Sequence, residues 1–192
     1  MPTPLECSTQ RKTFDPSLPA VAVGMGNLYP SWDHDLLVEA AGILKQRGQE
    51  KTLRWIGTGI DFENTRQRIQ ALKLERFELT GYLQLDAMNQ QLRQSHCLVF
   101  PIRNKPLNLA RCPFKCYQFA QAARPVITSD VGEVRAILGD LAIYVDPTPE
   151  GLADALSRVL EEPRREDIEY DLSNHRWEYR AKTLSEALLR MQ

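Results

Sequence analysis

The sequence predicts a single α/β domain with a parallel sheet of six strands and helices on both faces. Six short apolar runs of strand length alternate with segments in which apolar residues recur at helical spacing. This alternation requires crossover connections, which are right-handed and cover both faces of a parallel sheet with helices. The composition agrees, because 192 residues with 43% hydrophobic and 26% charged side chains can bury one core.

Each element is expected where an apolar run or stripe lies between turn signals. The expected strands are residues 20–25, 52–56, 77–79, 97–100, 125–128 and 142–145. The expected helices pass through Leu36–Leu44, Ile69–Leu72, Met88–Leu92, a segment opening at Pro113, residues 133–138 and residues 150–160. Asp33 is the expected cap of the first helix, and Gly48 is its expected stop.

The two ends of the chain depart from this alternation. Residues 1–18 contain three prolines and no apolar periodicity, so we expect a linker or lead-in there. After Pro163, a charged segment leads into a helix whose apolar stripe comprises Trp177, Ala181, Leu184, Leu188 and Met191. This stripe is expected either to pack on the domain or to reach a second one.

A basic segment of the chain predicts an anion site. Between Ala87 and Ser129 there is no acidic residue, although the whole chain carries 25 acids and 24 bases. The bases in this window are Arg93, Arg103, Lys105, Arg111, Lys115 and Arg124. Such a local positive field attracts anions.

The helix expected at Pro113 lies within this window. Proline is favoured at a first helical position, and the preceding Cys112 is a poor cap, so the first-turn amides are left free. Together with the helix dipole and the neighbouring Arg111 and Lys115, these amides predict a phosphate site. The alternative is a water-capped turn with two solvated bases.

Other functional motifs are incomplete. Gly24-x-Gly26 and Gly57-x-Gly59 lack the third glycine of the dinucleotide-binding fingerprint. The three histidines form no readable catalytic grouping, and no metal site is expected, because Cys112 and Cys116 have no accompanying ligands.

Composition also bears on partners and location. The formal net charge of -1 argues against nucleic-acid binding. No apolar run approaches 18 residues, and the N-terminus lacks a basic segment followed by an apolar one, so we expect a cytoplasmic protein.

The segment PFKCYQFAQAARPVITSDVGEV, residues 113–134, resembles the signature of the C-terminal domain of GT-B fold glycosyltransferases of the family 4 type. The resemblance extends to the first strand and its glycines, to WIGTGI at 55–60, to LTGYL at 79–83 and to the Trp177 helix. It implies that residues 19–192 form one Rossmann-like, nucleotide-sugar-binding half of a GT-B fold, with the last helix crossing back to the other half.

The resemblance implies a function in sugar transfer. In that family the C-terminal domain binds the nucleotide-sugar donor, so Arg111 and Lys115 would neutralise its diphosphate and Gln118 would hold its ribose. Tyr82 and the Gly57–Gly59 loop would line the base pocket. The implied substrate-binding positions are Asn27, Gly57, Gly59, Tyr82, Asn108, Ala110, Arg111, Lys115 and Gln118.

The chain would then be the donor-binding half of a retaining glycosyltransferase of the hexosyltransferase type, inactive without its N-terminal domain. The implied partners are a nucleotide sugar, an N-terminal acceptor-binding domain in the same or a separate chain, and a membrane contacted peripherally through that missing half. No cofactor is expected beyond the nucleotide sugar as substrate, and the sequence nominates no catalytic residue.

The sequence departs from the family pattern at four positions. The donor-binding pair of glutamates is replaced by Ala110 and Gln118, and the family's Arg and Lys after the first strand are replaced by Asn27 and Trp32. An alternative is therefore a degenerate, non-catalytic nucleotide-binding or protein-interaction module. Another doubly wound nucleotide-binding protein, such as a relative of the sugar-nucleotide epimerases, would share the fold without the Lys115 to Glu133 pattern.

Overall fold

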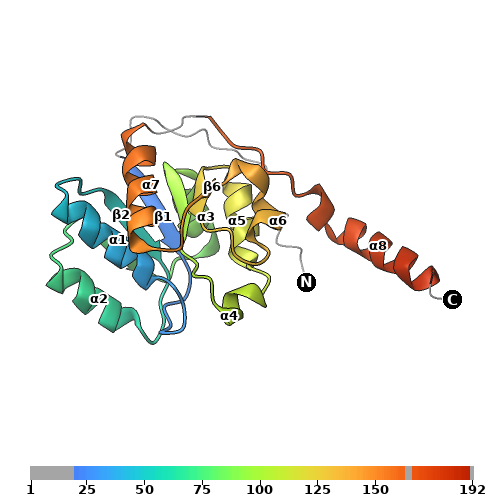
Figure 1. Ribbon diagram of the computed structural model, residues 1–192, viewed down its shortest axis with the longest axis horizontal. Helices are drawn as coiled ribbons and strands as arrows, with labels where there is room; N and C mark the ends of the chain where they lie inside the picture. Colours follow the sequence, from blue (N-terminus) through green and yellow to red (C-terminus); the bar gives the residue numbers. More distant parts are fainter. Residues whose placement is uncertain (1–19, 163–165, 191–192) are drawn as a thin grey trace.

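The computed structural model describes residues 20–162 and 166–190, so the expected lead-in at 1–18 lies outside the described residues. A six-stranded sheet forms the centre of the molecule, and every neighbouring pair of strands is parallel (Figure 1). The strand order is β3-β2-β1-β4-β5-β6. The strands are β1 (Val21–Met25), β2 (Thr52–Ile56), β3 (Phe77–Gly81), β4 (Cys97–Phe100), β5 (Val126–Thr128) and β6 (Ile143–Tyr144).

Helices cover both faces of the sheet, which confirms the predicted fold class. The helices are α1 (Asp35–Gln46), α2 (Phe62–Ala71), α3 (Leu85–Arg93), α4 (Pro106–Leu109), α5 (Phe114–Ala122), α6 (Val134–Leu138), α7 (Pro149–Glu161) and α8 (Trp177–Leu189), with 3-10 turns η1 (Gly139–Leu141) and η2 (Ser173–His175). Figure 1 shows α1, α2 and α7 on one side of the sheet and α5 and α6 on the other.

Two helix starts differ from the sequence prediction. The helix expected to open at Pro113 begins one residue later, at Phe114, and Pro113 is its cap residue. The cap of α1 is His34, so the prediction of Asp33 as the cap is wrong. The short helix α4 was not predicted, because four residues are too few to show helical periodicity.

The core consists of two apolar clusters separated by the sheet. In β1, Ala22 packs with the cluster under α1 and α7, whereas Val23 packs with the cluster under α5 and α6. Successive strand side chains point to opposite faces, so a strand that is buried on both sides is apolar throughout. The continuous apolar runs of the sequence are therefore strands.

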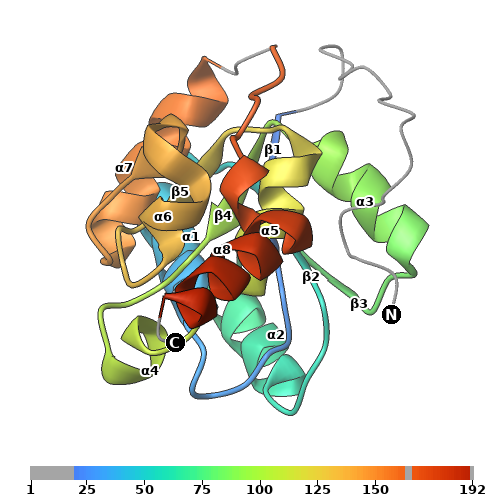
Figure 2. The same ribbon diagram turned by 90° about the vertical axis from the view of Figure 1, so that its right-hand side faces the viewer.

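The last helix, α8, extends away from the rest of the domain (Figure 1). None of its described residues is buried, and Trp177, Leu184 and Leu188 of the predicted stripe are exposed. At its beginning, Arg180 donates to the hydroxyl of Tyr117 on α5 over 3.3 Å, and Figure 2 shows α8 passing in front of α5. Met191 lies outside the described residues. The described part of the stripe does not pack on this domain, and its contact with a second domain stays a prediction.

The ends of β1 and β2 approach each other too closely for side chains. A Cβ atom on Gly57 would overlap the carbonyl group of Gly26 and lie 2.8 Å from its carbon, and Gly57 has a φ of +139°. The Gly26 carbonyl also accepts a hydrogen bond from the indole of Trp55 over 2.9 Å. Glycine at position 57 is therefore required by the packing of these two strand ends.

We predict that Gly57→Ala destabilises the fold by roughly 1–3 kcal/mol, because the added methyl group meets backbone and the residue has a positive φ. Gly42→Ala is the matched control. Gly42 lies within α1, and its new Cβ would make only an ordinary contact with Leu72, so this change should leave stability equal or slightly higher. Urea unfolding measures both, and equal stability of the two variants would contradict the close approach.

Candidate anion-binding site

The candidate site lies at the carboxyl edge of the sheet, beside the adjacent central strands β1 and β4. The order β3-β2-β1-β4-β5-β6 reverses direction between these two strands. In open parallel sheets, ligands bind in the crevice outside the strand ends at this switch point. Lys115 reaches this point, because a Cβ atom on Gly26, which follows β1, would lie 2.8 Å from the Lys115 Nζ.

Arg111 and Lys115 converge on one aromatic ring. The Lys115 Nζ lies 4.0 Å from the centre of the Trp32 ring, and the Arg111 Cζ lies 5.1 Å from it. Neither base has a carboxylate within 4.0 Å among the residues that the structure describes. The Nε of Arg111 is buried and has no hydrogen-bond partner there. The two bases are thus held together, and no acidic side chain of residues 20–162 or 166–190 neutralises them.

The surroundings of Lys115 make its positive charge unfavourable. Burial, with a further contribution from the charge of Arg111, lowers the pKa of Lys115 to about 8. An anion bound beside the ammonium would offset both effects. The two bases should therefore stabilise an anion that binds between or beside them.

The start of α5 adds backbone dipoles to the two side chains. Its cap residue, Pro113, provides no side-chain hydrogen bond, and the first turn contains no acidic residue. The first amides of a helix have no intrahelical acceptor and carry the positive end of its dipole. The predicted uncapped helix start is thus confirmed, with its first residue at Phe114.

The positive field is narrower than the basic segment of the sequence suggested. Arg103 forms ion pairs with Asp33, Asp35 and Glu39, and Lys105 pairs with Asp33 over 2.8 Å. These carboxylates precede the acid-free window in sequence, and the fold brings them beside it.

Two further bases of the window lie away from the site. Arg124 is 1% exposed, and its Nε donates to the carbonyl of Ser95 over 3.0 Å. Arg93 is the last residue of α3. Arg111 and Lys115 are the members of the window that remain at the site.

Asp33 organises the neutralised part of this edge. Its carboxylate is buried and accepts hydrogen bonds from the Asn108 side chain over 2.7 Å and from the Arg103 backbone amide over 3.1 Å. Burial alone would raise the pKa of Asp33, but the hydrogen bonds from Lys105, the Arg103 amide and Asn108 outweigh it and lower this pKa. Asp33 thus joins the loop after β1 to α4.

The other predicted site residues follow the carboxyl ends of several strands. Asn27 lies after β1 and is exposed, Gly57 and Gly59 lie after β2, and Tyr82 lies after β3 and is 71% exposed. In the segment after β4, Ala110 is exposed and Asn108 is buried.

Two of these residues differ in what they have available for a ligand. Asn108 donates to Asp33 and, over 2.7 Å, to the carbonyl of Arg103, so both of its amide hydrogens are used within the chain. Gln118, one turn along α5 from Lys115, is half-buried. Trp32 was predicted only as a replacement for a family base, and its contact with the two cations could not be read from the sequence.

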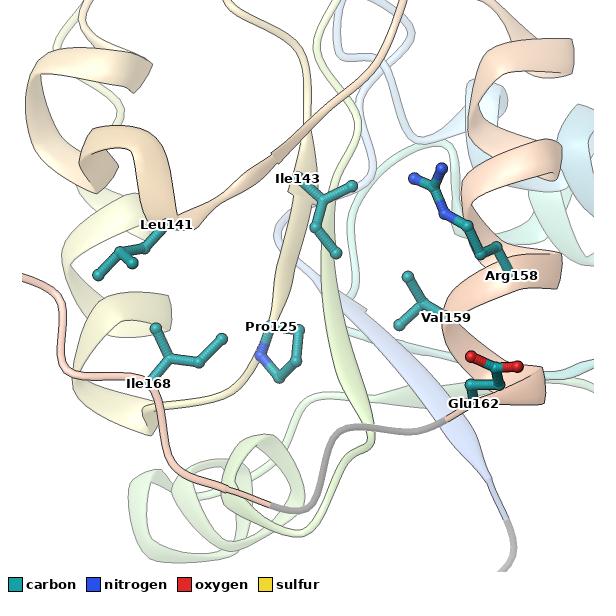
Figure 3. Close-up of a pocket in the computed structure, with 7 residues that line it drawn as sticks. All are labelled: Pro125, Leu141, Ile143, Arg158, Val159, Glu162 and Ile168. Atoms are coloured by element: carbon teal, nitrogen blue, oxygen red, sulfur yellow. The ribbon is translucent and has the colours of Figure 1, made fainter.

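A separate pocket of about 180 Å³ lies at the opposite, amino edge of the sheet (Figure 3). It is lined by Pro125, Leu141, Ile143, Arg158, Val159, Glu162 and Ile168. The lining is mainly apolar, and its two charged side chains have opposite signs. This pocket lacks the excess of positive charge that characterises the site at the carboxyl edge.

Residues 20–162 and 166–190 contain neither a metal-ligand cluster nor a helix fit to span a membrane. No group of three or more His, Cys, Asp or Glu side chains there is placed to hold a metal ion. Cys116 is buried and Cys112 is exposed. None of the helices in these ranges has the length and apolar character needed to cross a membrane.

Residues 19–162 match the model of the glycosyl transferases group 1 family. The chain belongs to this family. No curated protein matches the sequence. The candidate site therefore lies in a group 1 glycosyl transferase domain with a Rossmann-like fold.

Solved structures share the fold of this group 1 domain. HepE from Anabaena, in complex with UDP and glucose, is 16% identical with a TM-score of 0.66, and the match covers 88% of this chain and 48% of that one. The C-terminal domain of a group 1 protein, LpcC, from Francisella tularensis is 18% identical with a TM-score of 0.59, covering 76% of this chain and 78% of that one.

A third structure is the catalytic domain of cholesterol-alpha-glucosyltransferase from Helicobacter pylori. It is 14% identical with a TM-score of 0.61, and the match covers 90% of this chain and 99% of that one. The match to TarM from S. aureus covers only 30% of that chain. This chain therefore spans less than half the length of TarM and of HepE.

We predict that Asp33→Asn destabilises the fold by about 1–3 kcal/mol at pH 7, because Lys105 and the Arg103 amide lose a buried ionised acceptor. The pKa of Asp33 is lower in the folded chain, so its contribution is present above the ordinary value of about 3.9 and is lost as the pH falls below it. The difference between wild type and variant should therefore shrink toward pH 3.

Urea unfolding at several pH values measures this difference. Asp140→Asn is the control, because Asp140 forms an exposed surface pair with Arg135 and its removal should cost less than about 1 kcal/mol at pH 7. A deficit for Asp33→Asn that stays constant with pH would contradict the role of the ionised carboxylate.

Proposed function

We propose that this chain is the donor-binding half of a glycosyltransferase that transfers a sugar from a nucleotide diphosphate sugar. The observation that carries the proposal is the pair of bases, Arg111 and Lys115, which lie at the switch point of the sheet with no carboxylate partner in the described part of the chain. A diphosphate bears closely spaced negative charges that match two neighbouring cations and a free helix start.

The remaining parts of the donor find suitable groups along the same edge. Gln118 lies on α5 beyond Lys115 and would hydrogen-bond the ribose, since its amide both donates and accepts. Tyr82 and the loop from Gly57 to Gly59 would form the base pocket, where an exposed ring offers a stacking surface. Asn108 would hold α4 in place through Asp33 rather than contact the donor.

Comparison with solved relatives supports a nucleotide sugar as the ligand. HepE was solved with UDP and with UDP-glucose, and the Helicobacter pylori relative is described as a glucosyltransferase. By analogy, the proposed donor class is a nucleoside diphosphate sugar. The base, the sugar and the acceptor are left open by this proposal.

The proposal places this domain as the C-terminal half of a family 4 type, GT-B enzyme. The chain spans 48% of the length of HepE, which leaves room for a second half of similar size. The exposed apolar side chains of α8 offer a surface for that half, which would bind the acceptor. Any peripheral contact with a membrane would be made through that half.

The absence of a carboxylate at Ala110 favours a second candidate function. Ala110 is exposed at the same edge, and its methyl group cannot hold a sugar hydroxyl. A nucleotide-binding or protein-interaction module without catalysis fits this feature. Sugar transfer on addition of a complementary N-terminal domain would support the enzyme, whereas nucleotide binding without transfer would support the module.

We predict that at least one of UDP, GDP and ADP binds in the micromolar to millimolar range in isothermal titration calorimetry. Arg111→Ala should weaken that binding about 10-fold or more, because it removes a charge-assisted contact. Arg66→Ala is the matched control, because Arg66 pairs with Glu63 on the exposed surface of α2. Failure of all three nucleotides to bind, or equal losses in both variants, would refute the assignment.

We also predict that the affinity for the nucleotide falls above about pH 8. The diphosphate binds the protonated Lys115, whose pKa is about 8 in the free domain, so proton uptake must accompany binding at higher pH. Lys115→Arg should abolish this dependence, because arginine stays protonated throughout the range. Calorimetry from pH 7 to 9.5 tests the prediction, and identical pH profiles for both proteins would be evidence against it.

A further inference from the structure

We propose that Trp32 is a positioning residue that holds Arg111 and Lys115 side by side as the diphosphate clamp, in the place where a carboxylate would otherwise neutralise them. The inference rests on the proposed function for the identity of the ligand. It deepens that function by assigning a role to a residue of the loop between β1 and α1.

The positive charges of the two bases repel each other. Arg111 and Lys115 are like charges near one ring, and the charge of Arg111 contributes to the lowered pKa of Lys115. Without a favourable partner, two such side chains would turn apart into solvent. The negatively polarised face of an indole attracts cations within about 6 Å, and both bases meet that distance.

A carboxylate and an aromatic ring differ in how many hydrogen-bond donors of the two bases they occupy. A carboxylate at this position would accept hydrogen bonds from both bases, as Asp33 does from the neighbouring Lys105 and Arg103. The face of a ring attracts the charge without consuming most of the donors. The buried Nε of Arg111 accordingly has no partner among the described residues. The indole therefore holds the cations while leaving their donors for a ligand.

Hydrogen bonds of the loop between β1 and α1 fix the position of Trp32. The next residue, Asp33, is anchored by Asn108 over 2.7 Å and by the Arg103 amide, and the backbone amide of Trp32 donates to the carbonyl of Tyr29 over 2.9 Å. The same network that neutralises Arg103 and Lys105 thus sets the position of the ring. One group of bases is neutralised, and the other is kept available.

The test uses inorganic pyrophosphate and UDP with the full chain and the variants Trp32→Phe and Trp32→Leu. Trp32→Leu should weaken pyrophosphate binding about 5- to 30-fold at pH 7, and Trp32→Phe should weaken it less, because a phenyl face attracts cations less strongly than an indole. Trp177→Leu is the matched control, because it makes the same substitution at an exposed indole on α8, away from the two bases. This control should bind as the wild type does.

A second readout follows Lys115 directly by NMR of its Cε resonance, assigned with Lys115→Arg. The pKa of Lys115 should rise in the order Trp32, Phe, Leu, because a lysine released from the ring turns toward solvent and away from Arg111, which removes both causes of its lowered pKa. If Trp32 only supported the loop, the pKa of Lys115 would be the same in the wild type and in both variants. Thermal unfolding of each variant shows that the fold is retained.

The proposal is overturned if the wild type does not bind pyrophosphate, if Trp32→Leu binds it as tightly as or more tightly than the wild type, or if the pKa of Lys115 does not rise in Trp32→Leu. These failures are distinct from failure of the proposed function. Pyrophosphate binding that depends on Trp32, without binding of any nucleoside diphosphate, would reject the donor-binding role alone. UDP binding that is indifferent to Trp32 would reject the positioning role alone.

Discussion

The contact between the Lys115 side chain and the bare backbone of Gly26 is the constraint on which the candidate site depends. A Cβ atom on Gly26 would lie 2.8 Å from the Lys115 Nζ, so the absence of a side chain lets a base from α5 reach the end of β1. The carbonyl of Gly26 also accepts a hydrogen bond from the indole of Trp55, and it packs against Gly57. One strand end thus joins the sheet, the loop after β2 and the cation pair.

The division of charge at this edge follows from which acids the fold brings to it. Asp33, Asp35 and Glu39 lie at or before the start of α1 and on its first turns, where they reach Arg103 and Lys105. Arg111 precedes α5 and Lys115 lies in its first turn, and both contact an aromatic ring instead. The result is a fixed, neutral scaffold beside a small region of uncompensated positive charge.

The sequence predicted the fold and nominated the two bases of the candidate site, but it did not reveal their surroundings. Buried parallel strands are apolar on both faces, so runs such as Cys97–Phe100 were recognisable and their order implied the parallel sheet. Arg111 and Lys115 were found because they adjoin an uncapped helix start. The pairing of Arg103 with Asp33 joins residues 70 positions apart, so local composition could not reveal it. The stacking of Trp32 on Lys115 depends on tertiary contact in the same way.

The family and the geometry support ligand binding more strongly than they support catalysis. Membership of the glycosyl transferases group 1 family and the cation pair both favour a nucleotide-sugar ligand. Under the proposed function, catalysis would require a second half, for which α8 offers exposed apolar side chains. Binding is therefore the property that the isolated domain should display.

The most direct measurement is an NMR titration of the ¹⁵N-labelled chain with UDP, GDP and ADP, following the backbone amides. We predict that at least one nucleotide shifts the amides of Gly26, Phe114 and Lys115 far more than those of Ile143 and Val159, which line the pocket at the opposite edge. Shifts confined to that opposite pocket, or no shift with any of the three nucleotides, would contradict it.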